Sequence, residues 1–394
     1  MQKHGGTDMS APKRSWIKLS PLALSVHLAT LFLVAIWVLP TLGLFVSSVR
    51  DKDQISVSGW WTALTSSTQN IIYRAPGADG QRERDGVFVI TGNVLEGGAG
   101  RISTFGVSSR APKKFKAGEA AELKGGANLI VQSNGDFEIV STKRLTKKRG
   151  QRIFFQATAP PRFTLDNYRN VIGAESLGRS FINSLTVTIP ATIIPILIAA
   201  FAAYALAWME FPGRAILIAI VVGLLVVPLQ MSLIPLLTKY NQIGAFFGVP
   251  AKTYLGIWLA HTGFGLPLAI YLLRNYIAGL PREIMESARV DGATDFEIFR
   301  KIVLPLSFPA LASFAIFQFL WVWNDLLVAI VFLGAGDSEL VLTGRLNNLL
   351  GMRGGQWDIL AASAFVTIIV PLLVFFGLQR YLVRGLLAGS VKGG

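Results

Sequence analysis

A polar segment from Glu286 to Pro305 holds the side chains best suited to a specific contact with another molecule. Apolar runs precede and follow it. Pro281 suits the first position of a helix, because its missing N–H would have no partner there. Glu283 and Glu286 then fall in the early turns, where carboxylates meet the positive end of the helix. The segment is therefore expected to begin as a short polar helix.

The second half of this segment has the signals of a turn and another helix. Gly292 after Asp291 fits a left-handed helix end. Thr294 and Glu297 have the spacing of a capping box, and Pro305 marks the entry to the next apolar run. The pattern predicts a rigid helix–turn–helix elbow at a membrane face, where another protein grips it. The alternative is an amphipathic connector without a partner.

Several kinds of catalytic chemistry are excluded by the sequence. No Gly-Lys dipeptide occurs, so the chain cannot form the phosphate-binding loop of an ATPase. It has no cysteine, which excludes disulfides and thiol-based metal or redox sites within it. His27 and His261 are isolated and are interpreted as structural. We therefore predict a non-catalytic protein without cofactor or metal, whose energy must come from a partner.

Long apolar runs flank the elbow and must position it. Hydrophobic residues make up 52% of the 394 residues and charged residues only 15%, against about 25% charged residues in an ordinary soluble domain. A run of roughly 20 apolar residues crosses the bilayer core. Six such runs extend from Leu22 to Val46, Leu185 to Met209, Ile216 to Leu237, Thr253 to Leu273, Ser307 to Leu333 and Ile359 to Val383. The predicted fold class is an all-α polytopic membrane protein with six transmembrane helices.

Basic residues before the first run predict its orientation. Lys3, Lys13, Arg14 and Lys18 precede it, so we expect the N-terminus in the cytoplasm. The apolar core is too long for a cleaved signal peptide, and no small-x-small site follows before Arg50, so the run is interpreted as an anchor. Because successive spans cross the membrane in opposite directions, the elbow and the C-terminus are expected in the cytoplasm as well.

The net charge of +14 raises the question of a nucleic-acid partner. Part of the excess lies in the cytoplasmic basic flank, and much of the rest lies at 110–116 and 143–152 in the long loop after the first run. No stripe of aromatic and basic residues of the kind that binds single strands accompanies it. We expect membrane lipid around the apolar runs and no nucleic-acid partner.

The long loop after the first run has a strand-rich middle. Its segments 86–91, 127–132, 137–141 and 152–156 are rich in β-branched and aromatic residues and are separated by turn residues. We expect a small inserted β domain outside the membrane. The chain is accordingly divided into 1–66 with the first transmembrane helix, 67–162 with the β-rich domain, and 163–394 with the other five spans and the elbow.

The elbow resembles the EAA signature of ABC-importer permeases. Glu286, Ala288 and Gly292 match that signature, while Ser287 stands where the family has alanine. Further resemblance lies at 58–62, 163–168, 254–258, 264–267, 271–274, 317–324 and 379–392. The chain is similar to the second permease subunit of maltose-type importers, which take up carbohydrates. Its external insertion is similar to that of the α-glucoside permeases.

This resemblance implies the type I ABC-importer permease fold in a bacterial inner membrane, with both termini cytoplasmic. The chain would form half of the translocation pathway for an oligosaccharide. Its partners would be an ABC ATPase subunit dimer, a sister permease subunit and a periplasmic sugar-binding protein. The residues that would contact the ATPase are Glu286, Ser287, Ala288, Asp291, Gly292, Ile302, Leu304 and Pro305.

Polar residues within the spans are candidates for a sugar path. Gln230, Ser232, Asn324 and Asp325 could line such a path, or could form hydrogen bonds between helices. Asp325 is interpreted as a partly hydrated residue near the outer third of its span, facing a partner interface.

The glycine-rich loop from Gly334 to Trp357 is a candidate contact with the binding protein. The resemblance implies that this external loop reaches the ligand cleft of the docked protein. Leu346, Asn347 and Asn348 would form part of its tip, where amides can bond sugar hydroxyls. The alternative is a flexible turn without such a contact. For the β domain, likewise, contact with the binding protein and a decorating role both stay open.

Two functions from other classes stay open. An ion-coupled secondary transporter needs carboxylates or half-helices near the bilayer midplane, and only Asp325 is available. A membrane-tethered β-domain sensor leaves the elbow and the other five spans without a role. Co-purification with an ATPase subunit separates these two from the permease.

Overall fold

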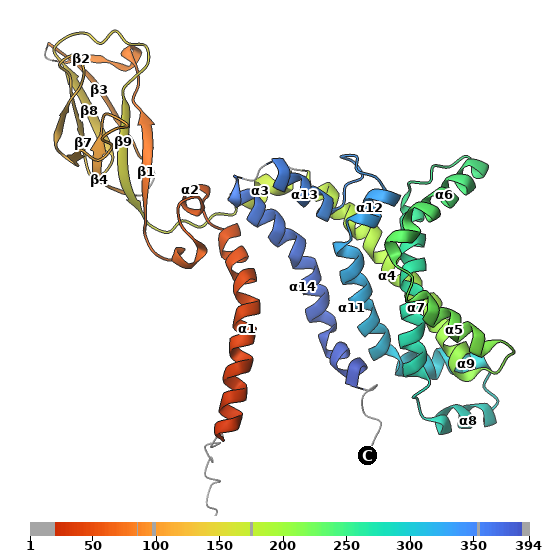
Figure 1. Cartoon of the computed structure of the whole chain (residues 1–394). Coiled ribbons are helices and arrows are strands. Elements are labelled where there is room, and N and C mark those ends of the chain that lie inside the picture. Colours follow the sequence, from red (N-terminus) through yellow and green to blue (C-terminus); the bar gives the residue numbers. More distant parts are fainter. Residues whose placement is uncertain (1–19, 85, 97–99, 174–175, 353–354, 388–394) are drawn as a thin grey trace, which may run out of the picture.

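The computed structural model describes residues 20–84, 86–96, 100–173, 176–352 and 355–387. It consists of a helical part and a β domain, and the β domain lies to one side, beyond the C-terminal end of helix α1 (Figure 1). Lys3, Lys13, Arg14 and Lys18, which were used to predict the orientation, lie outside the described residues, as does the tail after residue 387.

Four helices are long and apolar enough to cross a membrane by themselves. They are α1 (Pro21–Ser48), α4 (Leu177–Trp208), α7 (Tyr254–Ile277) and α14 (Trp357–Leu387). Each contains a proline in its interior. Membrane helices tolerate proline because neighbouring helices and local adjustments satisfy the freed carbonyl groups.

The third predicted span is bent rather than straight. Its apolar run forms α5 (Arg214–Leu224) and α6 (Leu229–Phe247), which meet at 106°. Pro228, at the N-cap of α6, has no N–H with which to continue the helix from α5. Hydropathy alone could not reveal this break, because the residues around it are all apolar.

The fifth predicted span is also divided. Its run contains α11 (Phe308–Asn324) and the short α12 (Leu327–Phe332), separated at Asp325. The helical segment Asp295–Leu306 meets α11 at 68°. The described helices therefore give four candidate spans that are single helices, or up to six spans when each bent pair is counted as one.

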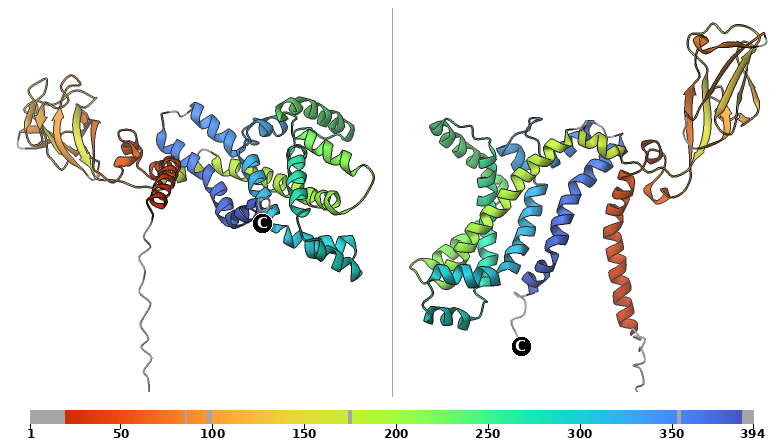
Figure 2. Two further views of the ribbon diagram at one scale, coloured as in Figure 1. Left: turned by 60° about the horizontal axis from the view of Figure 1, so that its bottom comes forward. Right: turned by 180° about the vertical axis from the view of Figure 1, so that it is seen from behind.

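The crossing of α4 with α7 forms the centre of the helical part, and α11 packs against both (Figure 2). Helix α1 stands apart from this centre and packs mainly against α14 (Figure 1). Of the 28 residues of α1, only Gly43 and Ser48 are buried. An apolar helix with so much exposed surface requires hydrocarbon around it, which agrees with a membrane protein.

The β domain is a sandwich of two antiparallel sheets. One sheet has the order β1-β9-β4-β5 and the other β2-β3-β8-β7-β6. The strands are β1 (Ser67–Arg74), β2 (Arg82–Arg84), β3 (Val87–Asn93), β4 (Arg101–Gly106), β5 (Phe115–Lys116), β6 (Ala120–Glu122), β7 (Asn128–Val131), β8 (Asp136–Ser141) and β9 (Arg152–Ala159). Alternate side chains of the longer strands, such as Ile153 and Phe155, face inward and form a separate core.

The two connections to the β domain lie side by side. Arg50 pairs with Phe163 in an antiparallel bridge, so the chain leaves and re-enters the helical part at one point. Asn167, in α3 (Asp166–Gly173), donates through Nδ2 to the carbonyls of Ser48 and Arg50 at 2.9 and 2.8 Å. Gln54, in α2 (Lys52–Ile55), bonds the chain on its return. This geometry is that of a domain inserted into a short connection.

Candidate docking elbow and external loop

The elbow begins with helix α8 (Arg282–Val290). This helix ends in a left-handed turn at Gly292. Pro281 is the N-cap rather than the first helical residue, one position from the prediction. Gly292 has φ of +83°, as predicted. The N–H of Ala293 donates to the carbonyl of Ala288, and the N–H of Gly292 to that of Arg289, each at 3.0 Å. These two bonds form a Schellman motif, which satisfies carbonyls at the helix end.

The second arm of the elbow starts at α9 (Asp295–Ile298). The predicted capping box is present, with Thr294 and Glu297 each bonding the other's backbone N–H. A π-helical turn (Phe299–Val303) and α10 (Leu304–Leu306) continue the arm. Pro305 therefore lies inside a helical segment, and the break before α11 falls at Ser307. A widened turn before a proline accommodates the missing N–H and the ring.

Buried residues of both arms fix the elbow to the helices above it. Met285, Phe299 and Val303 are at most 4% exposed and pack with residues of α4 and α7. Asp295 Oδ1 accepts hydrogen bonds from Tyr204 Oη of α4 at 3.2 Å and from Arg289 Nη2 at 3.3 Å. A displacement of the elbow must therefore carry the ends of α4 and α7 with it.

The opposite face of the elbow is exposed and partly apolar. Val290 is 88% exposed and Phe296 is 59% exposed, one on each side of the Gly292 turn. The eight predicted contact residues divide between the two faces. Glu286, Ser287, Asp291, Gly292 and Pro305 are exposed, whereas Ala288, Ile302 and Leu304 are half-buried against the core. Apolar side chains held in this way on a rigid turn suit insertion into a partner's groove.

The four predicted path residues lie in the two broken spans. Gln230 is exposed and Ser232 half-buried in the first turn of α6, directly after the break. Asn324 Nδ2 donates to the carbonyl of Leu320 at 2.7 Å. Asp325 Oδ1 accepts the N–H of Val328, in the first turn of α12, at 3.0 Å. Among the described residues no hydrogen bond joins any two of the four.

The loop from Gly334 to Trp357 contains a helix, α13 (Leu342–Met352), which includes Leu346, Asn347 and Asn348 of the predicted tip. Gly344 is buried, and a Cβ there would lie 2.9 Å from Leu340 Cδ2, so this glycine allows close packing. Asn347 and Asn348 are exposed, whereas Leu346 is half-buried and lines a cavity with α1 and α14. The two amides therefore face outward, as a contact with another protein requires.

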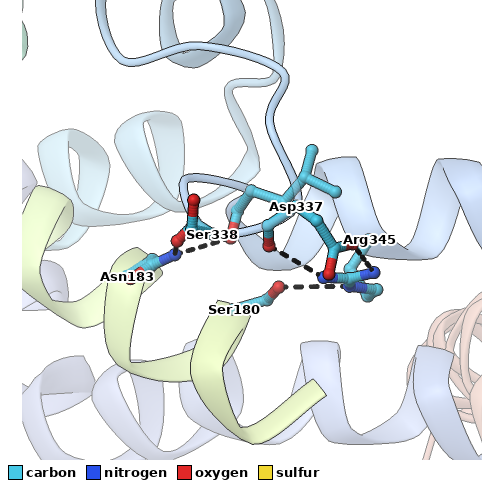
Figure 3. Close-up of polar contacts among 6 residues, drawn as sticks. Ser180, Asn183, Asp337, Ser338 and Arg345 are labelled. Atoms are coloured by element: carbon cyan, nitrogen blue, oxygen red, sulfur yellow. Dashed lines mark hydrogen bonds and ion pairs between the residues drawn. The ribbon is translucent and has the colours of Figure 1, made fainter. Parts of the chain in front are cut away.

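A cluster of polar residues, in which Ser180, Asn183 and Arg345 are buried and Asp337 and Ser338 are exposed, holds this loop on α4 (Figure 3). We call it the Arg345 cluster, and it consists of Ser180, Asn183, Asp337, Ser338 and Arg345. Arg345 is 9% exposed and donates through Nη1 to Asp337 Oδ1 at 2.6 Å, through Nη2 to the Asp337 carbonyl at 3.1 Å, and through Nε to Ser180 Oγ at 3.4 Å. Asn183 Nδ2 donates to the carbonyl of Ser338 at 2.9 Å. The cluster therefore fixes the loop to α4.

Comparison with known families identifies the class of this protein. Residues 176–387, which include α4, the elbow and α14, match the family described as binding-protein-dependent transport system inner membrane component. The chain belongs to this family. It is therefore an ABC transporter permease, with the mostly helical permease fold and several apolar helices.

Several similar proteins are transport-system permeases. The chain is 76% identical to the alpha-glucoside transport system permease protein AglG of Rhizobium meliloti, over 95% of this chain and 98% of that protein. It is 43% identical to the osmoprotective compounds uptake permease protein GgtD of Synechocystis, over 94% of this chain and 92% of that protein. It is 35% identical to the trehalose transport system permease protein SugB of Mycobacterium tuberculosis, over 59% of this chain and 84% of that protein.

Among solved structures, a bacterial ABC transporter that imports the acidic polysaccharide alginate is similar to this chain. The identity is 22%, the TM-score is 0.48, and the alignment covers 57% of this chain and 81% of that chain.

Proposed function

We propose that the chain is the permease subunit of an ATP-driven importer for oligosaccharides of the α-glucoside class. The exposed elbow carries the proposal, because it is rigid, capped at both arms and fixed to α4 and α7. The substrate class is supported by the alpha-glucoside permease that is 76% identical over nearly the whole length of both chains.

In this proposal, a separate ABC ATPase subunit dimer supplies the energy and docks on the elbow. Val290 and Phe296 enter a groove of the ATPase, and Glu286, Ser287 and Asp291 form the polar rim around it. Movement of the ATPase pair then displaces α4 and α7 as one body with the elbow, through the packing of its buried residues. The helical cavity formed with a sister permease subunit opens to one side of the membrane at a time.

The outer surface receives the sugar from a periplasmic binding protein. We place this contact at Asn347 and Asn348, whose amides are exposed on the rigid α13, with Leu346 beside them. The chain would cross the bacterial inner membrane six times, with both termini in the cytoplasm and the β domain (67–162) in the periplasm between the first helix (1–66) and the remaining five (163–394). Gln230, Ser232, Asn324 and Asp325 would lie along the sugar path, at the breaks of the two bent spans.

Substitution at Gly292 tests this proposal. A valine there is strained by about 1–2 kcal/mol, because a side chain disfavours positive φ. We expect Gly292→Val to lose co-purification with the ATPase subunit and sugar uptake in cells. Gly248→Val is the matched control, since Gly248 has φ of +68° and, like Gly292, has no atom within 4 Å of an added Cβ. Gly248 ends α6, far from the elbow (Figure 1).

The control should keep both the ATPase subunit and uptake. Wild-type values of both quantities for Gly292→Val would refute the docking role of the elbow. If the wild-type chain itself binds no ATPase subunit, an ion-coupled secondary transporter or a membrane-tethered sensor becomes the better description.

A further inference from the structure

A basic cavity opens at the end of the β domain that is remote from the helices. Strand β1 runs away from the junction with α1, and its last residue, Arg74, pairs with Arg152 at the far end (Figure 1). The cavity has a volume of about 660 Å³ and is lined by residues of both sheets at this end and of the loops 76–78, 107–109, 123–127 and 143–152. Pockets for small molecules in proteins span about 300–1,000 Å³.

The walls of this cavity carry one sign of charge. Its basic residues are Lys124, Lys143, Arg144, Lys147, Arg149 and Arg152. None of the described residues that line it is an aspartate or a glutamate. In the described part of the chain none of these six side chains forms an ion pair. Like charges that lie close together without counter-charges repel one another. This repulsion destabilises the empty cavity and favours the binding of an anion.

The floor of the cavity is apolar. Ile90 and Ile139, from β3 and β8, are each 2% exposed and lie beneath the basic rim, together with Leu123 and Ala127. Basic side chains on an ordinary solvent-exposed surface do not surround buried apolar residues in this way. A cavity that combines an apolar base with a few convergent polar groups has the composition of a ligand site.

The basic segment over the cavity is held in place by its backbone. Leu145 donates its N–H to Gln81 Oε1 at 3.0 Å and accepts from Gln81 Nε2 at 3.1 Å. The N–H of Ala78 donates to the carbonyl of Lys147 at 3.0 Å. Gly150 approaches the opposite strand so closely that an added Cβ would lie 1.8 Å from the carbonyl oxygen of Ala75. The cations therefore project from an ordered frame, which lowers the entropic cost of binding.

We propose that this cavity binds a small organic polyanion, with its phosphate or carboxylate groups at the basic rim and its apolar body on the floor. Charge-assisted hydrogen bonds from lysine and arginine to phosphate or carboxylate are about twice as strong as neutral ones. The ligand is a soluble molecule rather than a lipid of the surrounding bilayer, because the cavity lies at the end of the domain away from the spans (Figure 1). Nothing in this inference depends on the docking role of the elbow.

Binding of two probes to the purified full-length chain in detergent tests the proposal. Tripolyphosphate serves as the phosphate probe and citrate as the carboxylate probe, with titration calorimetry as the measurement. The variant K143Q/K147Q/R149Q removes three rim cations and keeps Leu145 and the backbone bonds. We expect it to bind the preferred probe about tenfold or more weakly than wild type, since several charge-assisted contacts are lost.

The variant R82Q/K113Q/K116Q is the matched control, because it removes the same charge from exposed residues of the domain outside the cavity. It should bind the probe within about twofold of wild type and, like the rim variant, keep the wild-type melting temperature, since all six side chains are exposed. If both variants bound the probe equally weakly, the effect would come from net charge alone, and the proposed site would be refuted. Absence of binding of both probes to wild type at millimolar concentration would also overturn it. A third result would overturn it as well: the chain binds the periplasmic binding protein through the three rim cations but binds neither probe. That result would mean that the rim contacts an acidic protein surface.

Discussion

Arg345 and Asp337 join the loop from Gly334 to Trp357 to α4 by a contact that sequence spacing does not reveal. They lie eight positions apart, which matches no regular neighbour spacing, and an arginine in a glycine-rich loop is normally exposed. The residues of α4 that bond this loop did carry a signal in the sequence. Ser180, Asn183 and Ser184 follow a spacing of three and four, which places them on one face of a helix. That polar face lies just before the predicted apolar run and was therefore left out of the span.

Substitution of Asp337 should give a pH-dependent loss of stability. The hydrogen bond from Arg345 and then its charge hold the pKa of Asp337 below the ordinary value of 3.8, with a smaller contribution from Arg179. A lowered folded pKa means that the contact stabilises the loop above the unfolded pKa and is lost as the pH falls through the folded pKa. Asp337→Asn should therefore melt at a lower temperature than wild type at neutral pH. The difference should vanish in acid below the folded pKa.

Tryptophan fluorescence of the detergent-solubilised chain can follow melting across this range. Glu122→Gln, an exposed carboxylate on β6 of the separate β domain, is the control and should melt like wild type at neutral pH. A difference between Asp337→Asn and wild type that stays constant from neutral pH into acid would contradict the ion-pair account.

At the scale of the element, pattern predicted where helices and strands lie better than where they break. The four predicted strand segments coincide with β3, β7, β8 and β9, because β-branched and aromatic residues dominate them. β1 has a polar first half and β4 follows a glycine-rich stretch, so neither had that signal. The elbow was predicted well, since caps depend on local side chains. The breaks at Pro228 and Asp325 were missed, because mean hydropathy does not report helix direction.

The bent pair α5–α6 is expected to cross the membrane. Single cysteines on either side of it give a direct test, because the chain has no native cysteine. Glu210→Cys, before α5, should react with an impermeant thiol reagent only after cells are opened. Lys252→Cys, after α6, should react on intact cells.

Ser133→Cys, in the β domain, is the positive control for access from outside. If Glu210→Cys and Lys252→Cys both react on intact cells, or both react only in opened cells, the two positions lie on the same side of the membrane. In that case α5–α6 is a re-entrant loop, and the chain has fewer than six spans.

At the scale of the whole molecule, the chain is two bodies joined at one point. Among the described residues, the buried core of the β domain contains only residues of that domain, and the cores of the helical part contain none of them. The trehalose permease match covers 84% of that protein but 59% of this chain, which leaves that protein no room for an insertion of this size. Sequence predicted the insertion from the strand-rich loop, whereas the shared entry and exit point needed the structure.

Excision of the β domain should therefore leave the helical part intact. Ser67 and Ala159 are paired at the base of β1 and β9, and neighbouring strands lie about 4.8 Å apart. A glycine–serine linker of about three residues can replace 67–159 without moving the Arg50–Phe163 bridge. We expect the shortened chain to keep its ATPase co-purification and the melting temperature of its helices, since no core contact is lost. Aggregation, or loss of the ATPase subunit, would mean that the domain is needed to assemble the permease. Normal assembly with impaired uptake would instead assign the domain a role at the binding protein.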